Sequence, residues 1–227
     1  MPNQTPSLHP VDLDHVPDIK LIACDIDGTL LDDDDAIHDD FWPLIDQLHA
    51  RGIIFCPASG RQYYNLLERF EPIADEVIFI AENGTYVVRG AVELSSDCLD
   101  SDVARDLIRV TRDLKSRGAN VGAVLCGKRS AYIERTDEAF LAEVVNYYHR
   151  LERVNDLLAA EDDILKVAVF DFESSERIAA PAFASFRSSH QVVVSGRHWL
   201  DVMAPRVSKG SAIRHIQENL HITREQT

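Results

Sequence analysis

The sequence predicts an α/β fold in which a parallel sheet is interrupted by a separate α+β unit. Three short apolar runs, at 20–29, 52–61 and 76–85, each end in a polar loop that contains glycine. Helical patterns fill the two gaps between these runs, at 39–52 and 62–70. Continuous apolar strands that alternate with helices are typical of a parallel sheet covered on both faces. After the third run the pattern changes to a mixture of hairpin, strands and helices.

The later elements are predicted from hydrophobic period and turn residues. In order they are a hairpin at 86–94, a helix at 101–118, strands at 120–126 and 130–136, a helix at 137–151, a strand at 164–172, a helical segment at 175–187, a strand at 190–196, a strand through Met203 and a helix that starts near Ser208. The first of these helices has Ser101 or Asp102 as its expected N-cap, because both side chains can accept hydrogen bonds from free backbone N–H groups.

This change of pattern divides the chain into parts. We expect a flexible tail at 1–17, the first part of a Rossmann-like core domain at 18–85, an inserted α+β unit at 86–196, and the second part of the core at 197–227. The tail has no apolar core and no basic leader, so we do not expect a signal peptide. Ligands of such parallel sheets bind at the carboxyl ends of the strands, where the site is therefore expected.

Composition excludes several classes of partner. The 227 residues carry 38 acidic and 23 basic side chains, a net charge of -15. This charge disfavours binding to nucleic acid or to an anionic membrane. No apolar stretch is long enough to cross a bilayer. The 4 cysteines form no CxxC pair, which favours a reduced, cytoplasmic compartment. We therefore expect a small-molecule partner.

The candidate chemistry begins with two aspartates at the end of the first strand. Asp25 and Asp27 are two residues apart, so their side chains project to the same side of a strand. Gly28 permits a sharp turn behind them. A divalent cation would relieve the repulsion between the two carboxylates. Two close carboxylates also differ in proton affinity, so that one can ionise and act as a nucleophile while the other holds a proton and acts as a general acid/base. Ser59 and Asn83 end the next two strands, so these polar groups are expected in one crevice.

These residues also carry a resemblance to a known family. "DIDGTL", which contains the aspartate pair, resembles motif I of the haloacid dehalogenase-like phosphatases. Ser59 in "PASGR" and Lys209 in "APRVSKGSAI" resemble motifs II and III, and Asn83 lies in an Asn-Gly loop like the one that leads into the family's cap domain. The large insertion resembles that of the Cof-type branch, which carries an α+β cap of the C2 type (subfamily IIB).

The resemblance implies a role for each motif residue. Asp25 would attack the phosphorus of a phosphomonoester, and Asp27 would protonate the leaving group and then activate water. Ser59 would hydrogen-bond a phosphoryl oxygen, and Lys209 would neutralise the transferring group at a helix N-terminus. Magnesium would be bound by the Asp25 carboxylate and the Asp27 backbone carbonyl. The residues expected to contact the substrate are Gly28, Thr29, Gly60, Arg61 and Asn83.

Several residues keep a structural interpretation beside the functional one. Arg61 is as well explained by a structural role as by substrate binding, and Asn83 is typical of a turn before glycine. The acidic run Asp32 to Asp35 is expected to be a solvated loop without a metal role. Lys166, inside the apolar segment "ILKVAVF", is expected to be a structural residue of the cap.

The family also has a fourth, acidic motif that follows a further strand and completes the magnesium site. Nothing after Lys209 in this sequence resembles it. We therefore expect a truncated second part of the core, with the first strand exposed at the edge of the sheet. An exposed apolar edge is prone to pairing with another chain, so a homodimer or aggregation is expected.

The leading hypothesis is a Mg²⁺-dependent phosphatase that hydrolyses a small phosphorylated metabolite, most commonly a sugar phosphate, through an aspartyl-phosphate. One alternative is a phosphomutase or phosphotransferase that returns the phosphoryl group to a sugar. A second is an inactive phosphate-binding fragment, which the missing fourth motif favours and the intact first three motifs disfavour.

Overall fold

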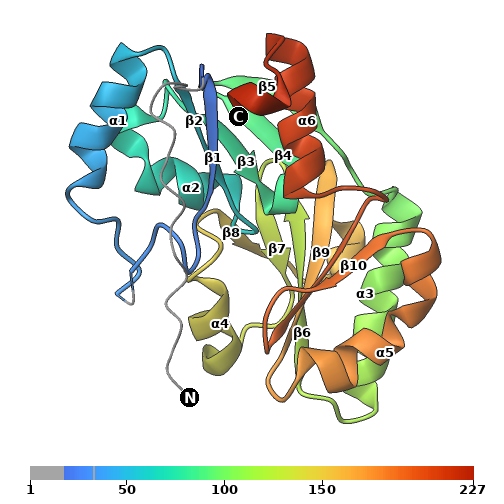
Figure 1. The fold of residues 1–227 in the computed structure, drawn as a ribbon. Helices are drawn as coiled ribbons and strands as arrows, with labels where there is room; N and C mark the ends of the chain where they lie inside the picture. Colours follow the sequence, from blue (N-terminus) through green and yellow to red (C-terminus); the bar gives the residue numbers. More distant parts are fainter. Residues whose placement is uncertain (1–17, 33) are drawn as a thin grey trace, which may run out of the picture.

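The computed structural model describes residues 18–227 except Asp33, so the predicted tail at 1–17 lies outside the described residues. The described residues form two sheets, one with strand order β1-β2-β3-β4-β5 and one with order β10-β11-β9-β6-β7-β8. Figure 1 shows the first sheet above the second, with the two packed into one body. The predicted α/β fold with an inserted α+β unit is confirmed.

The first sheet begins with three parallel strands. They are β1 (Leu21–Asp25), β2 (Ile54–Ala58) and β3 (Ile78–Ala81), and they alternate with α1 (Phe41–Ala50) and α2 (Tyr63–Arg69) as the sequence predicts. Phe55 and Phe79 pack in the apolar cluster of α1 and α2, whereas Cys56 and Ile80 pack in the cluster of α6 (Lys209–Leu220). The strands are therefore buried on both faces, which explains their continuous apolar sequence.

The hairpin after β3 extends this first sheet. Its strands are β4 (Tyr86–Arg89) and β5 (Val92–Ser96), and β4 pairs antiparallel with β3. The structure thus differs from the predicted division, which placed 86–94 in the inserted unit. The reason is that Val87 packs in the same apolar cluster as Ile80, so the hairpin completes the core of the first sheet.

The second sheet and its helices form the cap, which runs from about residue 97 to Met203. Its strands are β6 (Val121–Gly127), β7 (Ala131–Ile133), β8 (Leu151–Arg153), β9 (Ile164–Asp171), β10 (Gln191–Val194) and β11 (Trp199–Met203). The predicted core segment that starts at residue 197 therefore supplies β11 to the cap, where it pairs with β9 and β10. Leu200 and Val202 of β11 are buried in the apolar cluster of the cap, which explains why this strand belongs to the cap sheet.

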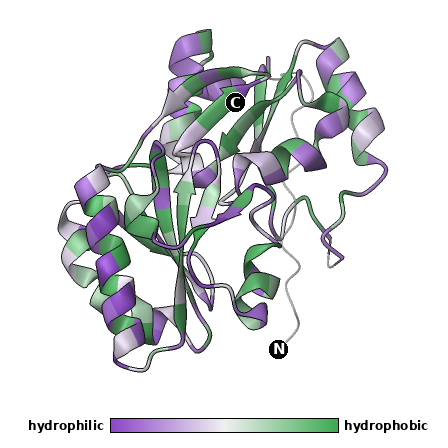
Figure 2. Ribbon diagram, turned by 180° about the vertical axis from the view of Figure 1, so that it is seen from behind, coloured by the Kyte–Doolittle hydropathy of each residue, from purple (hydrophilic) through white to green (hydrophobic). Residues whose placement is uncertain are grey.

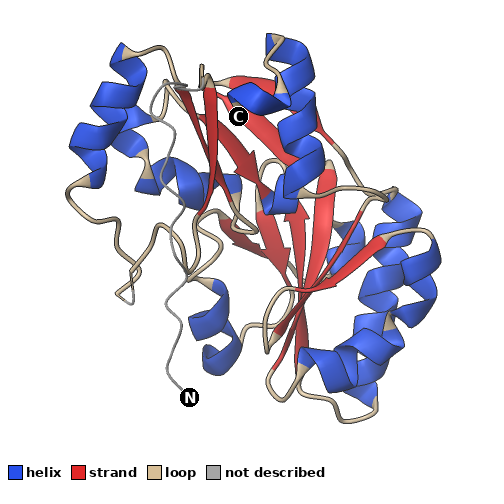
Figure 3. Ribbon diagram, viewed as in Figure 1, coloured by secondary structure: helices blue, strands red, loops and turns tan. Residues whose placement is uncertain are grey.

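Helices pack against both faces of the cap sheet, because the apolar cluster on each face includes helix residues. The long helix α3 (Ser101–Ser116) has Asp100 as its N-cap, one residue earlier than predicted. The predicted helix at 137–151 is shorter, because α4 (Glu138–Val144) ends before the unpredicted strand β8. The predicted helical segment at 175–187 is broken into a π turn, the short α5 (Ala180–Ala182) and a 3₁₀ turn. Figures 2 and 3 show apolar strands inside and helices with polar outer faces around them.

The edge of the first sheet at β1 is partly covered. Among the described residues β1 pairs only with β2. Leu21 is buried, and the backbone N–H of Lys20 donates to the carbonyl of Gln226 at 2.8 Å, so the last 3₁₀ turn (Arg224–Gln226) flanks one end of the strand. The edge position of β1 is as expected, and self-association through it stays a prediction. No helix in the described part of the chain has the length and apolarity of a membrane span.

Candidate active site

The polar loops that follow β1, β2 and β3 meet the start of α6 at one cavity. The cavity has a volume of about 460 Å³ and lies between the first sheet and the cap. Its floor includes Asp25, Asp27, Gly60, Arg61, Asn83 and Lys209. The parallel sheet thus brings its strand ends to the site, as expected for this architecture.

Lys209 reaches the first aspartate from the opposite end of the sequence. It is the first residue of α6, and its ammonium group forms an ion pair with the Asp25 carboxylate. The predicted helix start near Ser208 is confirmed, because Ser208 and Ser211 form a reciprocal capping box there. The side chains of Asp25 and Lys209 are 48% and 34% exposed, so both remain accessible from the cavity.

The Asn-Gly loop explains how α6 comes so close to β3. Glu82, Asn83 and Gly84 all have positive φ angles, of 50°, 62° and 98°. A Cβ atom on Gly84 would lie 2.4 Å from the carbonyl oxygen of Ser208. Only glycine permits this approach, which places the N-terminus of α6 and Lys209 beside the strand ends.

Asp27 is held by two residues of the loop that follows β2. The Ser59 hydroxyl donates to Asp27 Oδ2 at 2.9 Å, and Arg61 Nε donates to Asp27 Oδ1 at 2.8 Å. Partial burial raises the pKa of Asp27, but the hydrogen bonds and charge of Arg61, with help from Ser59, outweigh it and lower the pKa overall. The two aspartates therefore have separate cationic partners, Lys209 for Asp25 and Arg61 for Asp27.

Each guanidinium nitrogen of Arg61 contacts a protein group. Besides Asp27 it pairs with Asp35 at 2.7 Å and donates to the backbone carbonyl of Asn146 in the cap at 3.2 Å. Its side chain is only 8% exposed. These contacts support the structural interpretation of Arg61. The described residues of the acidic run are exposed, as expected for a solvated loop, but Asp35 also forms ion pairs with Arg61 and Arg69.

Three of the residues predicted to contact substrate do not line the cavity: Gly28, Thr29 and Ser59, whose side chain is fully buried. Gly28, with φ of 72°, forms the turn after the aspartates, and the Thr29 backbone N–H donates to the Ile26 carbonyl at 3.3 Å. Gly60, Arg61 and Asn83 do line it. The assignment of substrate contacts stays a prediction.

A largely buried charged cluster at the cavity wall was missed as part of the site, and two of its members, Lys166 and Asp201, line the cavity. Lys166 on β9 lies 2.9 Å from Glu82 Oε2 and 3.5 Å from Asp201 Oδ1 on β11, and the three side chains are at most 5% exposed. Burial raises the pKa of Glu82 more than Lys166 lowers it. The signal in the sequence was a lysine inside an otherwise apolar strand, because a buried ammonium requires nearby partners.

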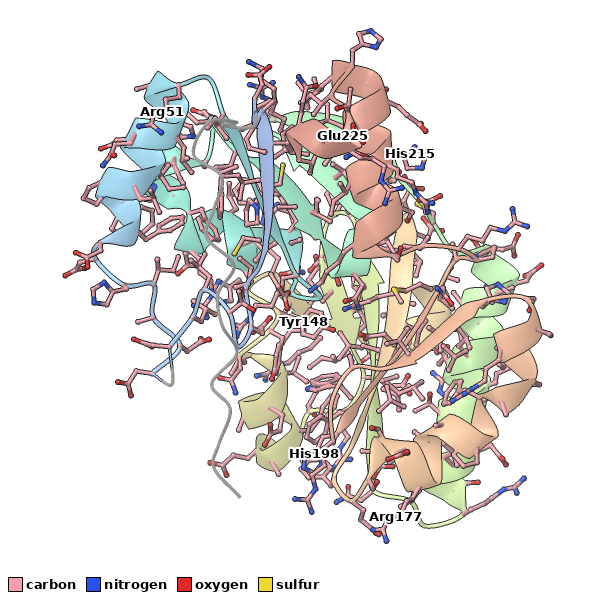
Figure 4. All side chains as sticks on the ribbon, in the orientation of Figure 1. Arg51, Tyr148, Arg177, His198, His215 and Glu225 are labelled. Atoms are coloured by element: carbon pink, nitrogen blue, oxygen red, sulfur yellow. The ribbon has the colours of Figure 1, made fainter. Side chains whose placement is uncertain are left out.

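The roof of the cavity comes from the cap and contains aromatic rings. Trp199 packs edge-on against Tyr147 and Phe170, with ring centroids 5.5 Å and 4.9 Å away. Figure 4 places Tyr148 where the two sheets face each other, and His198 farther out along the cap. The cavity thus has a charged floor on the first sheet and a mixed roof on the cap. The roof combines aromatic rings with charged and polar side chains, namely Glu143, Lys166, Arg197, His198 and Asp201.

Asp25 and Asp27 suit a hard cation that takes few ligands from the protein. Within the described residues no three His, Cys, Asp or Glu side chains converge to form a metal-binding group. Magnesium, however, is commonly bound by one or two carboxylates together with waters and substrate phosphate. Lys209 engages one oxygen of the Asp25 carboxylate. Ser59 and Arg61 engage both carboxylate oxygens of Asp27, which leaves its backbone carbonyl for the predicted metal contact.

The architecture is that of an α/β enzyme whose cap covers a cavity at the strand ends. Comparison with known sequences defines the family: the sequence model for the haloacid dehalogenase-like hydrolases matches residues 22–227. The chain therefore belongs to the haloacid dehalogenase-like hydrolase family, as the sequence motifs indicated.

Named relatives of this chain are phosphatases. The 5-amino-6-(5-phospho-D-ribitylamino)uracil phosphatase YbjI of Escherichia coli is 34% identical over 205 residues, which cover 88% of this chain and 73% of that protein. The HMP-PP phosphatase of Cronobacter sakazakii is 24% identical over 207 residues, 90% of this chain and 74% of that protein.

Solved structures share the fold over most of the chain. A protein from Eubacterium rectale matches with a TM-score of 0.79 and 27% identity, covering 92% of this chain and 79% of its own. The subclass IIB sugar phosphatase BT4131 matches with a TM-score of 0.75 and 17% identity, covering 92% and 78%. At that identity the second match shows the fold alone, which includes the type of cap.

Proposed function

We propose that this member of the family is a magnesium-dependent phosphatase that hydrolyses a small phosphorylated metabolite through an aspartyl-phosphate on Asp25. One observation carries the proposal: Asp25, paired with Lys209, and Asp27, held by Ser59 and Arg61, face the same cavity. Phosphoryl transfer of this kind requires a nucleophile, a group that carries a proton and cationic groups close to both.

Each residue has a defined task in this proposal. Asp25 attacks the phosphorus, and the bond from phosphorus to the leaving alkoxide breaks. In the structure Ser59 and Arg61 hold Asp27 as a carboxylate, so Asp27 must first take up a proton from solvent when substrate binds. It then gives this proton to the alkoxide and later takes one from the water that cleaves the aspartyl-phosphate. Lys209 and the N-terminus of α6 stabilise the negative charge of the phosphoryl group. Magnesium would supply further charge neutralisation when bound at Asp25 and the Asp27 carbonyl.

The substrate class follows from the two ends of the cavity. The charged floor suits a phosphate group. The roof sets the rings of Trp199 and Tyr147 beside charged side chains such as Arg197, so it suits a leaving group that has both a flat or apolar face and polar groups. A sugar ring offers such an apolar surface through its C–H face, and a heterocycle offers a flat aromatic face. The names of the two relatives, a phosphoribitylaminouracil phosphatase and an HMP-PP phosphatase, agree with a small phosphorylated metabolite.

The test is release of inorganic phosphate from p-nitrophenyl phosphate, and then from a panel of sugar and heterocyclic phosphates. We expect activity that requires Mg²⁺, disappears with a chelator and is absent in Asp25→Asn. Asp46→Asn is the matched control, because Asp46 is exposed on α1 and does not line the cavity. Activity that survives Asp25→Asn would refute the proposal, and transfer of phosphate to a sugar acceptor would favour a phosphomutase.

A further inference from the structure

The loop that follows β2 has its backbone fixed from both sheets. The carbonyl of Ser59 accepts from the backbone N–H of Asn83 at 2.9 Å, and the carbonyl of Arg61 accepts from that of Glu82 at 3.0 Å. The carbonyl between them, on Gly60, accepts from Lys166 Nζ of the cap at 2.8 Å. Lys166 thus supplies the one contact in this set that comes from a side chain of the cap.

A short chain of hydrogen bonds leads from Lys166 to the active-site aspartate. The peptide group whose oxygen Lys166 holds has its N–H on Arg61, and this N–H donates to Ser59 Oγ at 3.1 Å. Ser59 Oγ in turn donates to Asp27 Oδ2 at 2.9 Å. Because each bond orients the next group, rotation of this peptide would turn the Ser59 hydroxyl away from Asp27.

Lys166 itself is firmly placed. Its side chain is 2% exposed and lies between the carboxylates of Glu82 and Asp201. Asp201 is fixed in turn, because Asn83 Nδ2 donates to its second oxygen at 3.0 Å. Moving the ammonium away would leave the buried carboxylates of Glu82 and Asp201 without their cation, so it has little freedom to leave the Gly60 carbonyl.

We propose that Lys166 is a positioning residue for the phosphatase reaction: from the cap, it orients the Gly60–Arg61 peptide and thereby the Ser59 hydroxyl that holds Asp27. This inference rests on the proposed function for its kinetic consequences. It assigns Lys166 a task beyond packing within the cap, and it links the position of the cap sheet to the geometry of the proton carrier.

The test is a double-mutant cycle in a Glu82→Gln background, which removes one buried carboxylate so that replacing Lys166 leaves less unbalanced charge. We expect Lys166→Met to lower kcat on p-nitrophenyl phosphate roughly tenfold or more, since misplacement by about 1 Å can cost ~100-fold. KM should change little, because Lys166 does not contact the phosphate in this proposal. When Ser59 is already alanine, Lys166→Met should change kcat by about twofold or less, because its route to Asp27 is gone.

Lys128 offers a matched control. It also lies in the cap and forms an ion pair with the first sheet, to Glu93 on β5 at 3.0 Å, but no hydrogen bond from it reaches the site. Lys128→Met should leave kcat nearly unchanged in both backgrounds. An equal loss of kcat from Lys166→Met with and without Ser59 would overturn the proposal, because a purely structural residue would act that way.

A crystal structure of the Glu82→Gln/Lys166→Met variant separates this proposal from the proposed function. We expect the Gly60 carbonyl to turn and the separation of Ser59 Oγ and Asp27 Oδ2, now 2.9 Å, to exceed hydrogen-bonding distance. An unchanged separation would refute the positioning role, even if the chain proved to have no phosphatase activity. Loss of the bond would support the role whatever the reaction is.

Discussion

Replacement of Gly84 by alanine tests whether the Asn-Gly loop sets the position of α6. The new Cβ would lie 2.4 Å from the Ser208 carbonyl oxygen and 3.0 Å from the Lys209 nitrogen, whereas ordinary contacts begin at 3.4 Å. The loop and the helix start must therefore separate by about 1 Å, a form of overpacking that costs ~1–3 kcal/mol. The φ angle of 98° adds backbone strain of about 1–3 kcal/mol for alanine.

Gly118 provides a control that isolates the steric contact. Its φ of 95° is nearly the same, but nothing lies within 4 Å of the Cβ that alanine would add. The assay is urea unfolding followed by circular dichroism. We expect Gly118→Ala to lower the free energy of unfolding by the backbone strain alone. Gly84→Ala should lower it by ~1–3 kcal/mol more than Gly118→Ala, because it also creates the steric clash.

Activity should separate these two variants further. Displacing Lys209 by about 1 Å relative to Asp25 should reduce kcat by roughly 100-fold in Gly84→Ala, whereas Gly118→Ala should retain the wild-type kcat. If both variants lost the same stability and kept the same kcat, the close approach of Gly84 to Ser208 would not be what positions the lysine.

Three further replacements probe single contacts. Ser208→Ala removes the N-cap of α6 and should lower the free energy of unfolding by ~1 kcal/mol, measured by urea titration. Asp35→Asn breaks the half-exposed ion pairs to Arg61 and Arg69 and should cost up to about 1 kcal/mol, against no change for exposed Asp34→Asn. Ile22→Lys on the edge strand β1 should reduce the association expected in sedimentation velocity, and a monomeric wild type would contradict that expectation.

The fold was predictable wherever a segment's own pattern decides its structure. The three parallel strands and α1, α2 and α6 have continuous or periodic apolar sequences with clear end signals, such as Ser208 before α6. The hairpin at 86–94 was also predicted, but its place in the first sheet was not. Sheet membership depends on which apolar face a distant segment offers, and a local pattern does not contain that information.

The arrangement of the candidate site was predictable to a similar depth. The aspartate pair, Ser59 and Lys209 stand out because their spacing and sequence neighbours carry a motif. The roles of Asp35 and Lys166 depend on partners that lie far away in sequence, since Asp35 binds Arg61 and Lys166 binds the Gly60 carbonyl. Local sequence therefore makes Asp35 look like a solvated loop residue, although it is paired in the structure.

The charges on the cavity floor lead to a final prediction about the metal. Asp25 and Lys209 offset each other, as do Asp27 and Arg61, so the floor is close to neutral before a ligand binds. A phosphate monoester dianion adds two negative charges, which one divalent cation would offset. Inorganic phosphate should therefore bind much more tightly with Mg²⁺ than without it in titration calorimetry.

Asp25→Asn distinguishes the source of this effect. The variant removes the proposed carboxylate ligand of the metal while it leaves Lys209 unpaired and free to attract phosphate. We therefore expect phosphate binding that is stronger than wild type in the absence of Mg²⁺ and little affected by adding it. If Mg²⁺ strengthened phosphate binding equally in the wild type and in Asp25→Asn, the metal would be held by groups other than Asp25, and the proposed coordination would be wrong.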